Sequence, residues 1–235
     1  EFWVLLPNLG QQAYFLANLL IPLAVAAFLV GSVVAIFERD LKRMLGYSSV
    51  AQIGYIVLAI ALASSAGLTA AIVHFLNHAL MKAALFTAVA GIMLRYGTTN
   101  LDQLAGLGRR MPLTMLGFVF GGLSLIGVPL TAGFISKWYL IQAVLEEPGL
   151  GILLTMLILL ASLMAVVYIW KVVEVAYFKA PATGSLQDIK REEAPLPVLL
   201  VLWALVAANI WFGIDPSLPL MVANMEIGYV LGMGQ

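Results

Sequence analysis

Six long apolar runs, separated by short polar connections, constrain this chain more than any other feature. A helix needs roughly 20 apolar residues to cross the hydrocarbon core of a bilayer, and each run is close to that length or longer. Charged residues make up only 10% of the chain, whereas soluble domains carry about 25%. The sequence therefore predicts an all-α integral membrane protein embedded in lipid, with one spanning segment per run: 16–37, 44–64, 69–94, 113–145, 149–178 and 196–214.

The basic residues of the connections predict which way the segments run. Lysines and arginines follow the first, third and fifth runs, whereas the connections SSAG and EEPG contain none. Because cytoplasmic loops retain positive charge, we expect both ends of this chain on the outer side of a membrane, which we take to be the prokaryotic cell (inner) membrane. We expect a single transmembrane domain over 1–235, with 181–194 as its one linker-like loop and 215–235 as an interfacial tail.

The composition also limits the chemistry of the chain. It has no cysteine, which excludes disulfides, iron–sulfur clusters and thiolate-bound zinc. It has neither the glycine-lysine pattern of a phosphate loop nor a basic surface with aromatic residues for nucleic acid. We therefore expect no catalytic centre, no cofactor and no metal on this chain, so that any electron transfer takes place on another polypeptide.

The third run, AIVHFLNHALMKAALF at 71–86, carries both histidines of the chain and a lysine. His74, His78 and Lys82 are four residues apart, so on a helix they drift only about 80° while descending about 12 Å, and they form one stripe. Lys82 lies about 20 Å from either end of its helix, too far for its ammonium to reach the interface. Ionisable groups at this depth mark ion or proton paths, and histidine is the side chain that titrates nearest neutrality. The stripe predicts a proton path.

Other interpretations of these polar residues stay open. Histidines at i and i+4 can hold zinc, but the glutamate of the H-E-x-x-H pattern and a third ligand are lacking. A hydrogen bond between helices explains a single histidine, though it explains a lysine at mid-depth less well. Lys171 is only about 12 Å from the end of its run and can extend toward the interface, with Glu174 at i+3 as its ion-pair partner.

The fourth run is too long for one perpendicular helix, and GVPLTAG at 127–133 interrupts it. Pro129 removes a hydrogen-bond donor and clashes with the preceding turn, while Gly127 and Gly133 tolerate open backbone. Broken helices at membrane depth line cavities and ion sites in transporters. We expect Lys137 in the first turn of the second half-helix, where the positive helix end disfavours its ammonium form. A proline kink or a tilted helix is the alternative.

Three stretches resemble a known family: DLKRMLGYSSVAQIGYIVLAI at 40–60, HFLNHALMKAALF at 74–86 and SLIGVPLTAGFISKW at 124–138. They are similar to the antiporter-like membrane subunits shared by respiratory complex I, membrane-bound hydrogenases and Mrp-type cation/proton antiporters. NHALMKAALF and WFGID look most like the D-type subunit of Mrp antiporters. The resemblance implies a bundle of about fourteen helices with two inverted five-helix repeats, each containing a broken helix. This chain would match the second repeat plus one further helix, as the C-terminal half of a longer protein.

The resemblance also implies roles for particular residues. Lys82, His78 and His74 would belong to a polar axis at mid-membrane, and Lys137 would be the proton site of the broken helix. Some relatives have histidine at the position of Gln52, whose neutral amide only hydrogen-bonds or orders water. A second tier of polar residues would support the path: Gln52, Ser124, Thr131, Ser136, Lys171 and Glu174.

The function implied is a proton-translocating subunit of a multisubunit Mrp-type cation/proton antiporter. Its partners would be other membrane subunits, and protons, together with sodium as a candidate coupled ion, would be transported. Two alternatives are a proton-pumping subunit of complex I (NADH-quinone oxidoreductase) or of a membrane-bound hydrogenase, and a structural subunit that transports nothing. The first repeat of the family carries a glutamate–lysine pair that these 235 residues lack.

Overall fold

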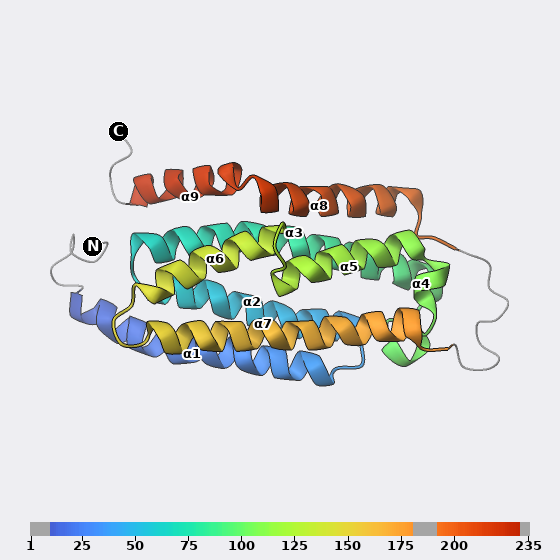
Figure 1. Cartoon of the computed structure of the whole chain (residues 1–235), viewed down its shortest axis with the longest axis horizontal. Coiled ribbons are helices and arrows are strands. Elements are labelled where there is room, and N and C mark those ends of the chain that lie inside the picture. The colour runs from blue at the N-terminus through green and yellow to red at the C-terminus, as the bar shows by residue number, and fades with distance from the viewer. Residues whose placement is uncertain (1–9, 181–191, 231–235) are drawn as a thin grey trace.

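The computed structural model describes the backbone of residues 10–180 and 192–230, and the side chains of 18–180 and 192–225. Within these ranges the chain forms helices and no β-strand. The long helices lie side by side along one axis (Figure 1). They are α1 (Gly10–Phe37), α2 (Leu41–Ala61), α3 (Ser65–Tyr96), α7 (Gly151–Val173) and α8 (Leu196–Ile214).

The predicted arrangement of spans is confirmed. The five long helices are each long and apolar enough to cross a membrane. The fourth run forms two half-helices, α5 (Pro112–Ile126) and α6 (Ala132–Leu145), separated at the predicted break. Shorter elements lie near the connections: η1 (Leu101–Gln103), α4 (Leu107–Arg110) and the π-helical turn η2 (Glu174–Phe178). The fold is therefore an all-helical membrane bundle with a broken fourth span.

Helix α3 is the central element, since it packs against α2, α5, α6, α8 and α9. Ser64 caps its start by accepting a hydrogen bond from the backbone N–H of Gly67 at 3.0 Å, which satisfies one of the free donors of the first turn. Gly97 ends the helix at φ +68°, in the left-handed conformation that glycine adopts without strain. These two signals delimit a helix of 32 residues, which carries the histidine–lysine stripe through the middle of the bundle.

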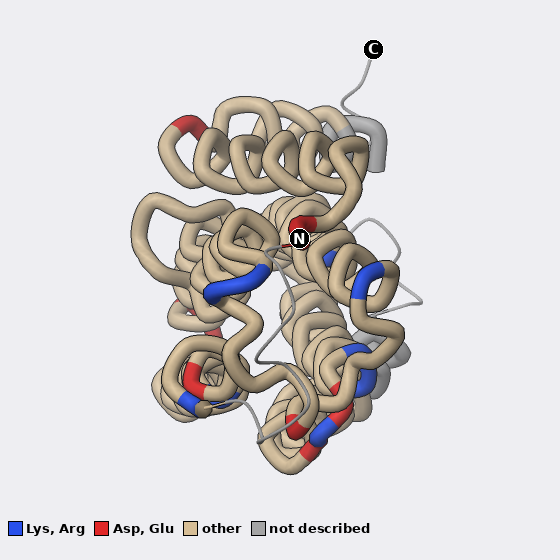
Figure 2. The backbone as a smooth tube through the Cα atoms, turned by 90° about the vertical axis from the view of Figure 1, so that its right-hand side faces the viewer, with Lys and Arg blue, Asp and Glu red and all other residues tan. Residues whose placement is uncertain are grey.

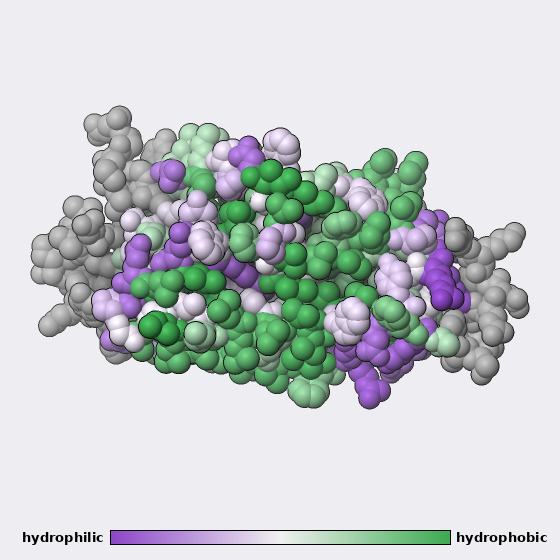
Figure 3. Space-filling view, in the orientation of Figure 1, coloured by the Kyte–Doolittle hydropathy of each residue, from purple (hydrophilic) through white to green (hydrophobic). Residues whose placement is uncertain are grey.

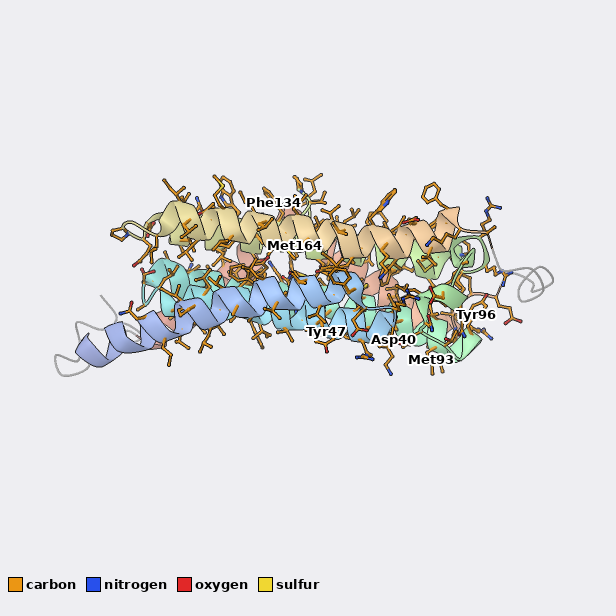
Figure 4. All side chains as sticks on the ribbon, turned by 90° about the horizontal axis from the view of Figure 1, so that it is seen from below. Asp40, Tyr47, Met93, Tyr96, Phe134 and Met164 are labelled. Atoms are coloured by element: carbon orange, nitrogen blue, oxygen red, sulfur yellow. The ribbon has the colours of Figure 1, made fainter. Side chains whose placement is uncertain are left out.

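The connections at one end of the bundle are joined by backbone and side-chain hydrogen bonds. Asp40 caps α2 by accepting from the backbone N–H of Arg43 at 3.0 Å, and it also accepts from the Thr99 hydroxyl. The backbone N–H of Leu41 donates to the Thr99 carbonyl at 2.8 Å. Asp40 and Tyr96 lie at this same end in Figure 4. The loop before α2 and the loop after α3 therefore hold each other in place.

Charge and hydropathy are distributed as a bilayer requires. Seen end-on, most of the backbone belongs to uncharged residues, with short blue and red stretches (Figure 2). The space-filling view shows a broad apolar surface along the middle of the molecule, with hydrophilic groups gathered toward its ends (Figure 3). Many large apolar side chains face outward, among them Phe75, Leu163 and Trp211, which are 57%, 63% and 60% exposed. This surface is suited to contact lipid or neighbouring membrane subunits.

The last described helix, α9 (Ser217–Val230), follows α8 after Asp215 and Pro216. It continues along the bundle and packs beside α3 (Figure 1). Residues 231–235 of the predicted interfacial tail, and most of the predicted linker 181–194, lie outside the described residues. The interfacial position of the tail stays a prediction.

Candidate functional site

The histidine–lysine stripe of α3 points into the bundle. His74 and Lys82 are 1% and 6% exposed, and His78 is partly buried. The rings of His74 and His78 are nearly parallel, with centroids 6.4 Å apart. His74 Nδ1 lies 2.9 Å from the Ser136 hydroxyl of α6. The stripe thus links α3 to the second half of the broken helix.

Lys82 is held by neutral acceptors on α2. Its Nζ donates to the carbonyl of Leu45 at 2.7 Å and to the hydroxyl of Ser48. It also lies 5.9 Å from the centroid of the Phe86 ring, within the range of a cation–π contact. Within the residues that the structure describes, no carboxylate pairs with this lysine. A buried lysine with neutral acceptors can release its proton without leaving an unpaired carboxylate behind.

The break between α5 and α6 is built from special backbone. Gly127 has φ +92° and Leu130 has φ +68°, a conformation that strains a residue with a side chain. Thr131 bonds back to the Val128 carbonyl at 2.6 Å, and Pro129 is exposed. A Cβ at Gly133 would overlap the carbonyl of Ser124. The two half-helices therefore approach so closely that only glycine fits at Gly133.

Ser124 closes the break by bonding to both sides of it. Its hydroxyl accepts a hydrogen bond from the backbone N–H of Gly133 at 3.1 Å and donates to Asn209 Oδ1 of α8 at 2.9 Å. The first N–H groups of a helix have no partner within that helix, so the serine supplies one for α6. Gly213, one turn further along α8, packs directly on the backbone of Leu130 and Thr131. Helix α8 thus supports the break from outside.

Lys137 lies at the break, but its electrostatic surroundings differ from those expected. It falls in the second turn of α6 and reaches back to α5. Its Nζ donates to the carbonyls of Leu125 and Ile126 at 3.0 and 2.7 Å, and to the Ser162 hydroxyl of α7 at 3.0 Å. The last carbonyls of a helix form its negative end. The expectation that the positive end of α6 acts on this ammonium is wrong, because the long side chain reaches the negative end of α5 instead.

The remaining predicted residues fall into two groups. Ser124, Thr131 and Ser136 all lie in or beside the break. Gln52 is buried on α2, and its Oε1 has no hydrogen-bond partner among the described residues. Its neutral amide thus lies on α2, the helix whose Leu45 and Ser48 accept hydrogen bonds from Lys82. The part of these second-tier residues in a proton path stays a prediction.

Lys171 and Glu174 do not form the predicted i, i+3 ion pair. The Lys171 ammonium donates to the carbonyls of Ile36 and Glu38, at 3.1 and 2.8 Å, where α1 ends. Glu174 is 47% exposed in its side chain and pairs with Lys179 at 3.8 Å. The predicted pair is wrong because the free carbonyls at the end of α1 provide Lys171 with better acceptors. In this arrangement Lys171 caps a neighbouring helix.

Sequence reasoning did not single out several polar residues of the site. Asn77 donates to the Ala132 carbonyl at 2.8 Å and ties α3 to the start of α6. Ser48 and Ser162 each accept from a lysine, and Asn209 bonds to Ser124. Asn77 was recognisable, because its position three residues after His74 puts it on the same helix face. Single serines in apolar helices carry no comparable signal. Within the described part of the chain, no group of three candidate metal ligands gathers.

Comparison with known proteins gives a consistent family. Residues 2–167 match the family described as "NADH:quinone oxidoreductase/Mrp antiporter, TM". The chain is 44% identical to NADH-quinone oxidoreductase subunit N of Desulforudis audaxviator over 175 residues, which are 74% of this chain and 34% of that protein. Across three such relatives it spans 34%, 39% and 38% of their length.

Two solved structures resemble the fold. A chain of the Mrp complex from Dietzia sp. DQ12-45-1b superposes with a TM-score of 0.82 at 24% identity, over 93% of this chain and 49% of that one. A chain of the membrane-bound sulfane sulfur reductase, an archaeal respiratory membrane complex, superposes with a TM-score of 0.78 at 32% identity. That match covers 88% of this chain and 33% of the other.

Proposed function

The chain belongs to the NADH:quinone oxidoreductase/Mrp antiporter transmembrane family, and on that premise we propose that it is part of a proton-translocating membrane subunit of a multisubunit complex. One observation carries the proposal. Lys82 and Lys137 are 6% exposed, lie within membrane-spanning helices, and donate only to carbonyl and hydroxyl oxygens. Buried ionisable groups are costly in a membrane and mark proton or ion pathways.

The geometry supports a sequence of proton transfers between the two lysines and one face of the membrane. A proton reaches Lys82 along a hydrated axis and passes to Lys137. Protons then leave or enter on one side near His78 and His74, whose rings are nearly parallel, and the His74 ring bonds to Ser136 of α6 at 2.9 Å. Positive charge on one lysine disfavours positive charge on the other, so the two change protonation state in turn. We place the histidine end on the outer side, following the charge of the loops.

The relatives favour a redox-driven complex of the NADH-quinone oxidoreductase type. The 44% identity to an N-type subunit is a similarity of sequence, whereas the likeness to the Mrp complex at 24% identity is one of fold alone. Partners would then be other membrane subunits and the subunits that carry out electron transfer. The Mrp-type cation/proton antiporter, with sodium as the coupled ion, is the second candidate, because the description of the matching family names Mrp antiporters as well.

A structural subunit that transports nothing is the alternative from another class. It predicts that replacing His78 and Lys82 by apolar residues of similar size leaves function unchanged and the protein equally or more stable, because polar bonds between membrane helices are worth only about 0.6 kcal/mol on average. The transport proposal predicts stable assembly without proton flux. The same pair of substitutions therefore separates the two.

The proposal is tested by Lys137→Ala in the complete complex reconstituted into vesicles with a pH-sensitive dye inside. We expect insertion and assembly to be retained and proton flux to be lost. Lys42→Ala is the matched control and should leave flux unchanged, since Lys42 is an exposed lysine in the first turn of α2. Normal flux in the Lys137 variant, in correctly assembled complex, would overturn the proposal.

A further inference from the structure

A second row of buried polar residues lies on α2. Ser48, Gln52 and Tyr55 are 0%, 2% and 1% exposed. On a helix these positions lie within about 60° of one another, over a rise of about 10 Å. They therefore line one face of α2, and that face looks into the protein. Polar residues in the interior of a membrane protein cost free energy of insertion, so three of them on one inward face indicate a function.

Helix α7 provides the opposite side of this row. It contacts α2 and carries Ser162 and the fully buried Tyr168. The two helices run in opposite directions, so the first part of α2 meets the last part of α7. Tyr55 and Ser162 both lie beside Lys137, whose Nζ is 5.6 Å from the centroid of the Tyr55 ring and 3.0 Å from the Ser162 hydroxyl. Tyr168 belongs to the same buried cluster as Met44 and Leu45, in the turn of α2 just before Ser48. We call these five residues the α2–α7 row: Ser48, Gln52, Tyr55, Ser162 and Tyr168.

Each end of the α2–α7 row is bonded to one of the two lysines. Ser48 accepts from Lys82 Nζ, and Ser162 accepts from Lys137 Nζ at 3.0 Å. Lys137 Nζ also lies 5.6 Å from the centroid of the Tyr55 ring. The row thus begins at one lysine and ends at the other, and it does not use the histidines of α3.

Unpaired polar atoms lie in the middle of the row. Among the described residues, the Tyr168 hydroxyl and Gln52 Oε1 are buried without a hydrogen-bond partner. Buried polar groups are nearly always hydrogen-bonded, to protein or to ordered water. A hydroxyl kept here with no protein partner costs stability compared with the phenyl ring of phenylalanine. Packing alone therefore does not explain why Tyr168 is tyrosine.

We propose that the α2–α7 row is the link that passes protons between Lys82 and Lys137, with water completing the chain at Gln52 and Tyr168. The inference rests on the proposed function. Each hydroxyl or water oxygen gives its proton to the next acceptor and receives one from the previous donor, while the Gln52 amide only holds a water in place, so only O–H and N–H bonds are exchanged. The ammonium of one lysine loses a proton and the amine of the other gains it. The histidines then serve the branch toward one membrane face, and the row serves the exchange between the lysines.

The test replaces the two phenols without changing their packing. Tyr55→Phe and Tyr168→Phe, alone and together, are placed in the complete complex and assayed for proton flux in vesicles and for thermal stability. We expect flux in the double variant to fall at least tenfold, roughly the scale of one lost hydrogen bond, with stability equal to the wild type or higher. Tyr139→Phe, a partly buried tyrosine of α6 outside the row, is the matched control with unchanged flux.

A second pair of variants tests the hydroxyl itself. Ser48→Ala should lower flux, and Ser48→Thr, which keeps a hydroxyl, should restore most of it. If Lys82→Ala and Lys137→Ala abolish flux while the double phenylalanine variant and Ser48→Ala keep it, the α2–α7 row is not the link and the proposed function stands. If the lysine variants themselves keep normal flux, both the function and the link are overturned.

Discussion

Replacing Ser124 by alanine should loosen the break in the fourth span. The serine hydroxyl holds two buried groups, the backbone N–H of Gly133 at 3.1 Å and Oδ1 of Asn209 at 2.9 Å. Both lose their partner in Ser124→Ala, and the close approach of the two half-helices leaves no room for a substitute side chain at Gly133. The half-helices are then joined by the strained turn between them and by the bonds of Lys137 to the end of α5.

The size of the effect follows from these two bonds. A hydrogen bond between membrane helices contributes about 0.6 kcal/mol on average, which suits the serine–asparagine bond because Asn209 keeps its bond to the Leu205 carbonyl at 2.9 Å. A buried backbone N–H left unpaired costs about 1 to 3 kcal/mol. We therefore expect the free energy of unfolding to fall by roughly 1.6 to 3.6 kcal/mol, most of it from the N–H of Gly133.

The assay is equilibrium unfolding in bilayer-like micelles, with proton flux of the reconstituted complex measured beside it. Ser49→Ala is the control, because Ser49 bonds only to the Leu45 carbonyl of its own helix, and it should change stability by less than about 0.5 kcal/mol. In Ser124→Ala with Asn209→Leu, the two losses should fall short of additivity by about 0.6 kcal/mol. A Ser124→Ala variant as stable as the Ser49 control would refute this account of the break.

Three further predictions concern other parts of the bundle. Gly133→Ala should destabilise by about 1 to 3 kcal/mol through overpacking, whereas Gly46→Ala, in open space on α2, should be neutral or stabilising; unfolding of both variants measures this. Burial raises the pKa of Asp40, but hydrogen bonds from the Thr99 hydroxyl and from the first turn of α2 outweigh burial and bring the pKa below its ordinary 3.8. The stabilisation by Asp40 is therefore present above pH 3.8 and is lost as the pH falls through the lowered pKa. Asp40→Asn should make the melting temperature depend less on pH in the acid range. Lys171→Met should cost about 1 to 2 kcal/mol by freeing the carbonyls that end α1, while flux persists and Lys171→Arg restores stability.

The spans and the break were predictable because each rests on a strong local signal. A run of about 20 apolar residues has few alternatives to a spanning helix, and GVPLTAG at 127–133 combines a missing donor with two flexible residues. The stripe of His74, His78 and Lys82 followed from helical geometry alone. In each case the prediction used residues within one helix or one connection.

The partners of the lysines were not predictable in the same way. A lysine side chain is long enough to reach acceptors on several helices, and which acceptor it bonds to depends on how the helices pack. Lys137 was expected to respond to its own half-helix, yet it bonds to the end of the preceding one. Lys171 was expected to pair with Glu174, yet it bonds to the end of α1. Both errors have one origin, because every helix end has free carbonyls, and only the packing of the helices decides which lysine reaches them.

The hydrogen-bond partners also distinguish two kinds of lysine within the spans of this bundle. Lys171 bonds only to backbone carbonyls, which accept a hydrogen bond but cannot pass a proton on. Lys82 and Lys137 each bond to backbone carbonyls and also to one hydroxyl, of Ser48 and Ser162. A hydroxyl both accepts and donates, so it can take a proton from the lysine on one side and release one on the other. The serine beside the ammonium, together with the deeper burial of Lys82 and Lys137, is what should separate a transporting lysine from a capping one.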